Sequence, residues 1–257
     1  VCDQGGECEL QDVALEYGAD KGQYNQPKRA VVDKDIGPLI ETEMSRCIHC
    51  TRCVRFGDEI AGMRELGATG RGEHMEIGTY LEHHLDSELS GNVIDVCPVG
   101  ALTAKPSRFQ ARPWELSSRA SVATHDCVGS NIFVHAFRNK VLRVIPRENE
   151  RINENWLSDR DRFAYEGLYY SDRLLFPHIK QNGQWQEVSW DQALEQVVKD
   201  LQKTDPEKLG ALASPSSPVE DHYLLQKLLR SLGSNHIDHR LHTADMRDQE
   251  EVALFPH

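Results

Sequence analysis

The run Cys47-Ile48-His49-Cys50-Thr51-Arg52-Cys53 contains three cysteines, each separated from the next by two residues, and the dipeptide Cys97-Pro98 follows well downstream. Three thiolates on one short turn, with a remote fourth thiolate before a proline, are typical of a site for a [4Fe–4S] cluster. The alternative is a zinc site, since four cysteines can hold Zn²⁺ tetrahedrally, but zinc sites usually pair two Cys-x2-Cys motifs. The spacing therefore favours an iron–sulfur cluster bound by Cys47, Cys50, Cys53 and Cys97.

The sequence around these cysteines resembles a two-cluster ferredoxin that has kept one cluster. In such ferredoxins the unit Cys-x2-Cys-x2-Cys-x3-Cys-Pro occurs twice, and the fourth cysteine of each unit binds the cluster of the other unit. One ligand set is complete here. The positions of the other set hold no thiol; they are Gly57, Ser87, Ser90 and Val93. We predict a ferredoxin-like domain with a single [4Fe–4S] cluster.

A second pair of cysteines lies at the start of the sequence. Cys2 and Cys8 are separated by five residues that include Gly5 and Gly6, and glycines let a backbone fold closely around a bound group. Two thiolates cannot complete a four-ligand site, so the missing ligands would precede Val1 or come from Cys127. Two buried structural cysteines are the alternative.

Composition limits the class of protein. The 257 residues include 29 Lys and Arg against 41 Asp and Glu, a net charge of −12 without a basic stripe, so nucleic acid is not an expected partner. The cysteines fall at metal-binding spacings and no signal peptide is visible, which indicates a reducing compartment. No apolar run is long enough to span a bilayer. Both ends of the sequence read as cut, and we expect it to be a piece of a longer protein.

The sequence changes character after Pro113-Trp114. Strands are predicted at 118–124, 131–138 and 141–147, with a hairpin turn at 138–140. The stretch 122–163 resembles the small Fe–S domain that opens molybdopterin-dependent oxidoreductases. Where that domain carries its ligand cysteines, this sequence has Ala123, Asp126, Ser130 and Ser158. We therefore expect the domain without its cluster, and Cys127 as a small buried residue rather than a ligand.

The last part of the sequence predicts an α/β unit. Ser189 and Gln192 form a capping box before a helix with an apolar face from Ala193 to Leu201. A short strand at 209–213 precedes a second helix over 218–232, whose inward face is predicted to comprise Leu224, Leu225, Leu228, Leu229 and Leu232, and a further strand begins at Asn235. This βαβ unit is consistent with the start of a molybdopterin-enzyme-like domain. The glycines of 67–72 lack the strand, helix and Lys of a phosphate-binding loop and predict a plain turn.

Together these motifs resemble the large iron–sulfur subunit (the G or 75 kDa type) of respiratory complex I, NADH:quinone oxidoreductase. In that family the first motif is His-x3-Cys-x2-Cys-x5-Cys, and Cys2 and Cys8 match its last two positions. The resemblance implies that its His and first Cys, and an N-terminal [2Fe–2S] domain, lie upstream of Val1. It also implies an α+β chain of four segments: 1–37, the remnant of a His/Cys-ligated [4Fe–4S] domain; 38–113, a ferredoxin-like [4Fe–4S] domain; 114–174, a mostly-β molybdopterin-oxidoreductase-type domain whose cluster is lost; and 175–257, the start of an α/β domain without molybdenum cofactor.

The function that the resemblance implies is electron relay. Single electrons would pass from a flavin subunit through [4Fe–4S] clusters toward quinone, with no catalytic residue, hydride-transfer site or quinone site on this chain. The implied partners are the flavin/NADH-binding subunit, a [2Fe–2S] subunit and a ferredoxin-like subunit with two [4Fe–4S] clusters. The implied location is the cytoplasmic face of a bacterial inner membrane or the matrix face of the mitochondrial one, reached only through the complex. Alternatives are a subunit of an NAD-linked hydrogenase or formate dehydrogenase, and a zinc-stabilised scaffold.

Overall fold

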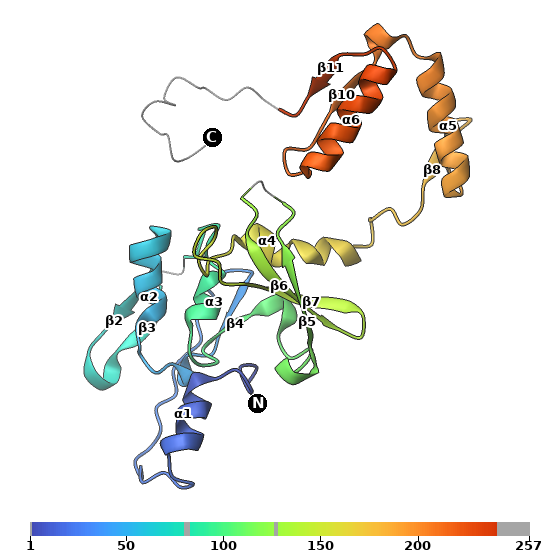
Figure 1. Ribbon diagram of the computed structural model, residues 1–257. Helices are drawn as coiled ribbons and strands as arrows, with labels where there is room; N and C mark the ends of the chain where they lie inside the picture. Colours follow the sequence, from blue (N-terminus) through green and yellow to red (C-terminus); the bar gives the residue numbers. More distant parts are fainter. Residues whose placement is uncertain (1, 80–82, 126–127, 241–257) are drawn as a thin grey trace, which may run out of the picture. The chain divides into compact units, whose positions relative to one another are not determined.

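The computed structural model describes residues 2–79, 83–125 and 128–240 (Figure 1). The chain divides into two compact units, which are described separately. The first unit contains residues 1–123 and 128–169, and the second contains 124–127 and 170–257. The described helices and strands give the mixed α+β content that the sequence predicts.

The N-terminal two thirds of the first unit form a small core between short strands and helices. Strands β1 (Ile40–Thr42) and β4 (Leu102–Ala104) pair antiparallel with Thr42 opposite Leu102, and β2 (Leu66–Thr69) pairs antiparallel with β3 (Glu76–Thr79). Helices α2 (Arg52–Phe56) and α3 (Asn92–Val96) lie side by side (Figure 1). The remaining elements here are α1 (Glu9–Tyr17), η1 (Met44–Arg46), the π-helical turn η2 (Gly57–Ala61), η3 (Gly72–His74), η4 (Lys105–Ser107) and η5 (Pro113–Glu115).

The glycine-rich stretch 67–72 is only partly the plain turn that the sequence predicts. Residues 67–69 belong to β2, because they pair with β3, and residues 70–72 lie in the connection between the two strands. Gly70 has a φ of +73°, and a Cβ at this position would lie 2.4 Å from the carbonyl oxygen of His74. Only glycine avoids both the left-handed strain and the collision, so these glycines shape a turn.

The rest of the first unit is a three-stranded antiparallel sheet. Its strands β5 (Ser117–Val122), β6 (Asn131–Phe137) and β7 (Lys140–Pro146) lie in the order β5-β6-β7, within two residues of the predicted ranges. Arg138 and Asn139 have φ values of +48° and +64°, which suit the tight hairpin turn that joins β6 to β7. Helix α4 (Asp159–Phe163) and the 3-10 turn η6 (Ala164–Tyr169) follow.

Hydrogen bonds join α3 to the segment that leads into α4. The fully buried Asn92 donates to the carbonyl of Leu157 at 2.8 Å and accepts from its N–H at 2.9 Å. Arg162 forms an ion pair with Asp95, with one nitrogen–oxygen distance of 3.2 Å. These contacts fasten the β-rich part of the first unit to the helix that ends immediately before Cys97.

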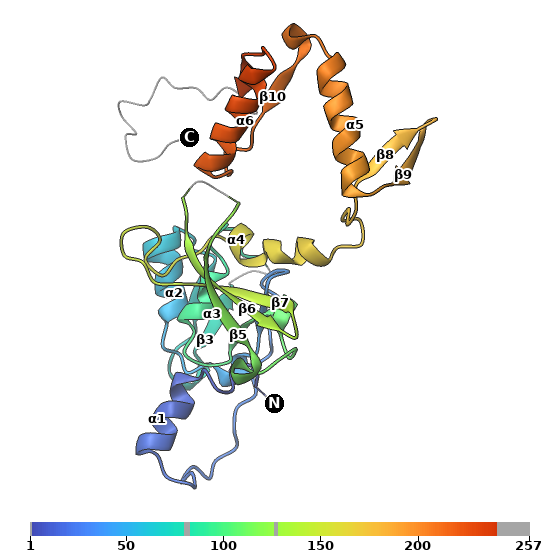
Figure 2. The ribbon, with the colours of Figure 1, turned by 45° about the vertical axis from the view of Figure 1, so that its right-hand side comes forward.

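The second unit begins with the hairpin of β8 (His178–Gln181) and β9 (Gln184–Glu187), which Figure 2 shows next to α5 (Trp190–Lys203). The turn η7 (Pro206–Lys208) precedes strand β10 (Gly210–Leu212). Helix α6 (Val219–Ser231) then crosses to β11 (His236–Asp238), which pairs parallel with β10. The predicted βαβ unit and the capping box of α5 are confirmed.

The predicted inward face of α6 is only partly buried. Leu229 is buried, but Leu224 and Leu228 are 59% and 49% exposed. The prediction was wrong for these two residues because a helix buries its stripe only where another element covers it, and the β10–β11 pair is too small to cover the whole stripe. Among the described residues, no helix combines the length and apolar character that crossing a membrane requires.

Candidate functional site

Cys47, Cys50, Cys53 and Cys97 line one small cavity of the first unit. Cys47 follows η1, Cys50 lies in the connecting loop, Cys53 is in α2, and Cys97 directly follows α3. The other lining residues are mostly apolar: Met44, Ile48, Thr51, Ile77, Pro98, Val99, Ala101 and Leu102. The structure thus gathers thiols from two distant segments in a largely apolar setting, in which Cys53 and Cys97 are buried, Cys47 is half-buried and Cys50 is exposed.

The backbone around Cys50 has an unusual conformation. His49 and Thr51, the residues on either side, have φ values of +55° and +61°. A left-handed conformation costs an L-residue about 1–2 kcal/mol. The local strain turns the chain tightly, so that Cys47, Cys50 and Cys53 all reach the cavity. The N–H of His49 donates to the sulfur of Cys47 at 3.4 Å.

The thiols of the site perturb one another. Burial, with smaller contributions from the neighbouring Cys97 and Cys47, raises the pKa of the Cys53 thiol to about 12. Burial also raises the pKa values of Cys47 and Cys97, while backbone hydrogen bonds, from His49 to Cys47 and from Val99, Ala101 and Leu102 to Cys97, act in the opposite direction. Several thiolates in one buried place repel each other, so a group that binds them must bring positive charge. The iron of a cluster meets this requirement, and the four-thiol donor set fits it.

Cys2 and Cys8 lie against the turn that carries Cys97. Cys8 is buried in the same core as Cys53 and Cys97, and Cys2 is half-buried. The N–H of Glu9 donates to the carbonyl of Pro98 at 3.1 Å. Cys127, the alternative source of a further ligand, lies outside the described residues. In the described part of the chain, the possible second cluster site therefore has two thiols, Cys2 and Cys8, which are half of the ligands that a cluster needs.

The positions of the absent ferredoxin set do not share one cavity. Val93 is fully buried in the core, and a Cβ on Gly57 would lie 2.8 Å from the carbonyl oxygen of Met63. Ser87 and Ser90 line a different cavity of about 340 Å³, together with Asp159. Two of the four positions thus lie in the packed core, and the other two line a separate cavity.

The other predicted non-ligand positions are also in structural use. Ser158 accepts a hydrogen bond from the N–H of Asp161 at 3.2 Å and so caps α4. The N–H of Ala123 donates to the carbonyl of Ser130 at 2.8 Å. Asp126 lies outside the described residues. No group of three or more His, Cys, Asp or Glu side chains, within the described ranges, converges as the ligands of a single metal ion would.

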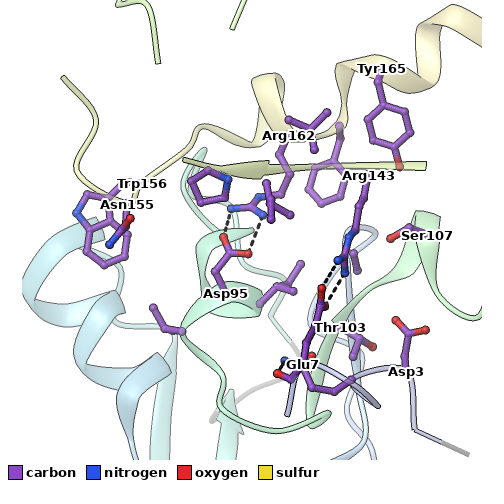
Figure 3. A pocket seen from close by; sticks show the side chains of 18 residues that line it. Asp3, Glu7, Asp95, Thr103, Ser107, Arg143, Asn155, Trp156, Arg162 and Tyr165 are labelled. Atoms are coloured by element: carbon purple, nitrogen blue, oxygen red, sulfur yellow. Dashed lines mark hydrogen bonds and ion pairs between the residues drawn. The ribbon is translucent and has the colours of Figure 1, made fainter. Parts of the chain in front are cut away.

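A larger cavity of about 460 Å³ lies between α3, β7 and α4 of the first unit (Figure 3). Two ion pairs stand on its wall, Arg143 with Glu7 and Arg162 with Asp95. Both arginines that line this cavity are thus paired. The Glu7–Arg143 pair joins the Cys2–Cys8 loop to strand β7 of the sheet.

Three structural contributors at these sites were missed from the sequence alone. Glu9 and Gly100 join the two cysteine loops, and Asp159 binds Ser90. The glycine two residues after Cys97-Pro98 could have been noticed as a position of close approach. Glu9 and Asp159 lie in ordinary charged stretches and give no comparable signal.

Comparisons with known families define the chain as an iron–sulfur oxidoreductase component. Four family models match in succession: NADH-ubiquinone oxidoreductase-G iron-sulfur binding region at 1–23; NADH-quinone oxidoreductase subunit 3, ferredoxin-like domain at 37–103; NADH-ubiquinone oxidoreductase NDSU1/NuoG-like, 4Fe-4S domain at 116–166; and Molybdopterin oxidoreductase at 173–254.

The curated relatives make the family specific. The G subunit of NADH-quinone oxidoreductase from Rickettsia felis is 52% identical over 91% of this chain and 35% of that protein. The mitochondrial 78 kDa NADH-ubiquinone oxidoreductase subunit of Neurospora crassa is 50% identical over 92% of this chain and 32% of that protein. The chain belongs to the family of this large iron–sulfur subunit and spans about a third of the length of these relatives. The resemblance seen in the sequence is confirmed.

A solved structure also matches part of the chain. It is an NAD⁺-reducing [NiFe]-hydrogenase in its H2-reduced state, with 28% identity and a TM-score of 0.38, covering 43% of this chain and 48% of that chain. So loose a superposition carries no argument about fold or function.

Proposed function

We propose that this chain is the electron-carrying part of a subunit of NADH:quinone oxidoreductase, which relays single electrons from a flavin subunit toward quinone. The observation that carries the proposal is the convergence of Cys47, Cys50, Cys53 and Cys97 on one cavity. These thiolates would hold a [4Fe–4S] cluster, which supplies reversible one-electron chemistry when bound. The curated relatives named as NADH-quinone and NADH-ubiquinone oxidoreductase subunits, which are 52% and 50% identical over 91% and 92% of this chain, support this function.

The chain's own residues then set the properties of the bound group. The sulfur of Cys47 accepts from the N–H of His49, and buried side chains such as Met44 and Leu102 shield one side of the cavity from water, while Cys50 on the other side is exposed. Hydrogen bonds to sulfur and exclusion of solvent are the principal controls on the potential of a cluster. Placement and tuning are therefore the work of this site.

Cys2 and Cys8 would supply two ligands of a second [4Fe–4S] cluster, with a His and a Cys upstream of Val1 completing it. A [2Fe–2S] cluster would lie further upstream. The proposed domains are 1–37, 38–113, 114–174 and 175–257, in the roles that the sequence predicts. The packing of Val93 and the helix cap at Ser158 support the loss of clusters from the second and third of these domains.

The proposed partners are other subunits of the peripheral arm: a flavin/NADH-binding subunit, a [2Fe–2S] subunit and a subunit with two [4Fe–4S] clusters. Attachment to the membrane would be through the complex alone. The side would be the cytoplasmic face in a bacterium or the matrix face in a mitochondrion, and the curated relatives include both bacterial and mitochondrial proteins.

Iron content tests the ligand assignment. The full-length protein is purified anaerobically as wild type, as Cys97→Ala and as Cys127→Ala, and iron, sulfide and low-temperature EPR spectra of the reduced samples are compared. Cys97→Ala should lose the EPR signal of one cluster and about four iron and four sulfide per chain. Cys127→Ala, a cysteine not expected to be a ligand, should retain both.

The same measurement separates the alternatives. Stoichiometric zinc with no EPR signal after anaerobic reconstitution would reject electron relay in favour of a zinc-stabilised scaffold. Unchanged iron in Cys97→Ala would reject the proposed ligand set.

A further inference from the structure

The loop that carries Cys2 and Cys8 docks directly on the turn that carries Cys97. The closest approach is at Gly100, which is buried: a Cβ built there would lie 2.2 Å from the sulfur of Cys2 and 3.2 Å from the Cβ of Gln4. Real Cβ atoms do not tolerate a contact of 2.2 Å. The sulfur of Cys2 thus occupies the space that any other residue at position 100 would fill.

A backbone hydrogen bond joins the two segments at a second point. The N–H of Glu9, the residue after Cys8, donates to the carbonyl of Pro98, the residue after Cys97, at 3.1 Å. Glu9 is the first residue of α1, and the N–H of a first helical residue has no partner within its own helix. The bond to Pro98 therefore satisfies a group that α1 leaves free.

Side chains hold the same loop at its edges. Arg112 donates to the carbonyl of Cys2 at 2.7 Å, and the N–H of Phe109 donates to Asp3 at 2.8 Å. Arg52, within the Cys47–Cys53 motif, makes a two-pronged ion pair with Glu9 at 2.8 and 3.0 Å. The Arg52 and Glu9 side chains are 49% and 60% exposed, so this pair contributes little compared with the buried contacts.

We propose that Gly100 and Glu9, the latter through its backbone N–H, are positioning residues. They set the distance between the two cysteine loops, and hence between the groups that these loops bind. The inference rests on the proposed function, since it concerns the spacing of two electron carriers. Gly100 acts by the absence of a side chain, and Glu9 acts through its backbone.

The test uses the full-length subunit in its assembled complex. Two reduced, paramagnetic clusters broaden each other's EPR signals through a magnetic interaction that falls steeply with their separation. Gly100→Ala forces Cys2 away from the Cys97 turn, and we expect this interaction to weaken while the signal of the Cys47–Cys97 cluster remains. Gly67→Ala is the matched control, because a Cβ on Gly67 meets nothing within 4 Å, and it should keep the interaction.

A second pair of variants applies even if Gly100→Ala fails to assemble. Glu9→Pro removes the N–H, and proline suits the first position of a helix. Cys8, which precedes it, is already extended at φ −98° and ψ 112°, as a residue before proline must be. Glu9→Ala removes only the carboxylate and keeps the N–H. The magnetic interaction should weaken in Glu9→Pro and not in Glu9→Ala.

The outcomes distinguish a failure of the proposed function from a failure of the positioning role. If the unsubstituted complex shows no second cluster signal that depends on Cys2 and Cys8, the two-cluster part of the proposed function fails. If both signals are present and their interaction is unchanged in Gly100→Ala, or in Glu9→Pro when Gly100→Ala does not assemble, the positioning role fails while electron relay stands. If the magnetic interaction weakens equally in Glu9→Pro and Glu9→Ala, the role of the backbone hydrogen bond is overturned.

Discussion

Asp159 links two parts of the first unit through a residue that stands in place of a cluster ligand. Its carboxylate accepts from the hydroxyl of Ser90 at 2.5 Å and from the N–H of Gly91 at 2.6 Å. Burial raises the pKa of the Asp159 carboxyl, and the bonds to Ser90 and Gly91 and the charge of Arg162 offset this only in part. The native state therefore holds a carboxylate whose ionised form is disfavoured by its surroundings.

This raised pKa predicts a pH dependence of stability. The native carboxyl binds its proton more tightly than an unfolded one, whose pKa is near the ordinary value of 3.8. Its contribution to the free energy of unfolding is therefore fully present below pH 3.8 and is lost as pH rises through the native pKa. As pH rises from 3.8 through the native pKa of Asp159, the free energy of unfolding should therefore fall more in the wild type than in Asp159→Asn.

Denaturant titrations of the two proteins at a series of pH values measure the difference. Arg162 belongs to the same helix as Asp159, while His84 and Asp86 line the same cavity. His84 and Asp86 are present in both proteins, so their titration cancels in the comparison. Parallel stability profiles for wild type and Asp159→Asn would contradict the prediction.

At the scale of single residues, a contact could be predicted from the sequence only where the two residues lie close together along the chain. The convergence of Cys47, Cys50 and Cys53 follows from their spacing, because neighbours in a turn stay together. Asp159 binds a residue 69 positions away, and no local pattern records such a pairing. The assignment of the cysteines as ligands stays a prediction until iron is measured.

Among the elements, helix α5 begins at a complete capping box. The hydroxyl of Ser189 accepts from the N–H of Gln192 at 3.3 Å, and the side chain of Gln192 accepts from the N–H of Ser189 at 3.1 Å. Replacing an N-cap serine by alanine typically costs about 1 kcal/mol. Ser189→Ala should therefore lower the free energy of unfolding of the second unit by about 1 kcal/mol.

Circular dichroism during denaturation of the full-length protein measures this change. Ser189→Asp is the matched control, since aspartate also caps helices well, and it should restore most of the loss. A loss in Ser189→Asp equal to that in Ser189→Ala would show that the hydrogen bond is not the source of the stability.

The elements also show why boundaries were easier to predict than burial. Local signals define where α5 begins and where β6 turns into β7, and the structure confirms both. Whether Leu224 and Leu228 of α6 are buried depends on which other element covers them. That information lies in tertiary packing, so the periodicity of α6 could predict a helix with an apolar stripe but not its cover.

At the scale of the whole molecule, the four ferredoxin positions that carry cysteines lie together, whereas the four positions that lack a thiol lie apart. One cavity is lined by Cys47, Cys50, Cys53 and Cys97. The other four positions are divided between the packed core at Val93 and Gly57 and a separate cavity at Ser87 and Ser90. The ion pair of Arg162 with Asp95 and the Asn92–Leu157 bonds fasten α3 in this arrangement. The number of clusters is therefore a property of the packing as well as of the cysteine count.

This difference predicts that restoring the thiols will not restore a cluster. A variant that combines Gly57→Cys, Ser87→Cys, Ser90→Cys and Val93→Cys should bind no more iron than the wild type after anaerobic reconstitution, because Met63 and Asp159 occupy the necessary space. Since a side chain at position 57 would itself collide with Met63, the three-site variant without Gly57→Cys serves as the control for folding. A gain of about four iron per chain with a second EPR signal would show instead that the packing adapts to a cluster, and that the loss of thiols alone removed it.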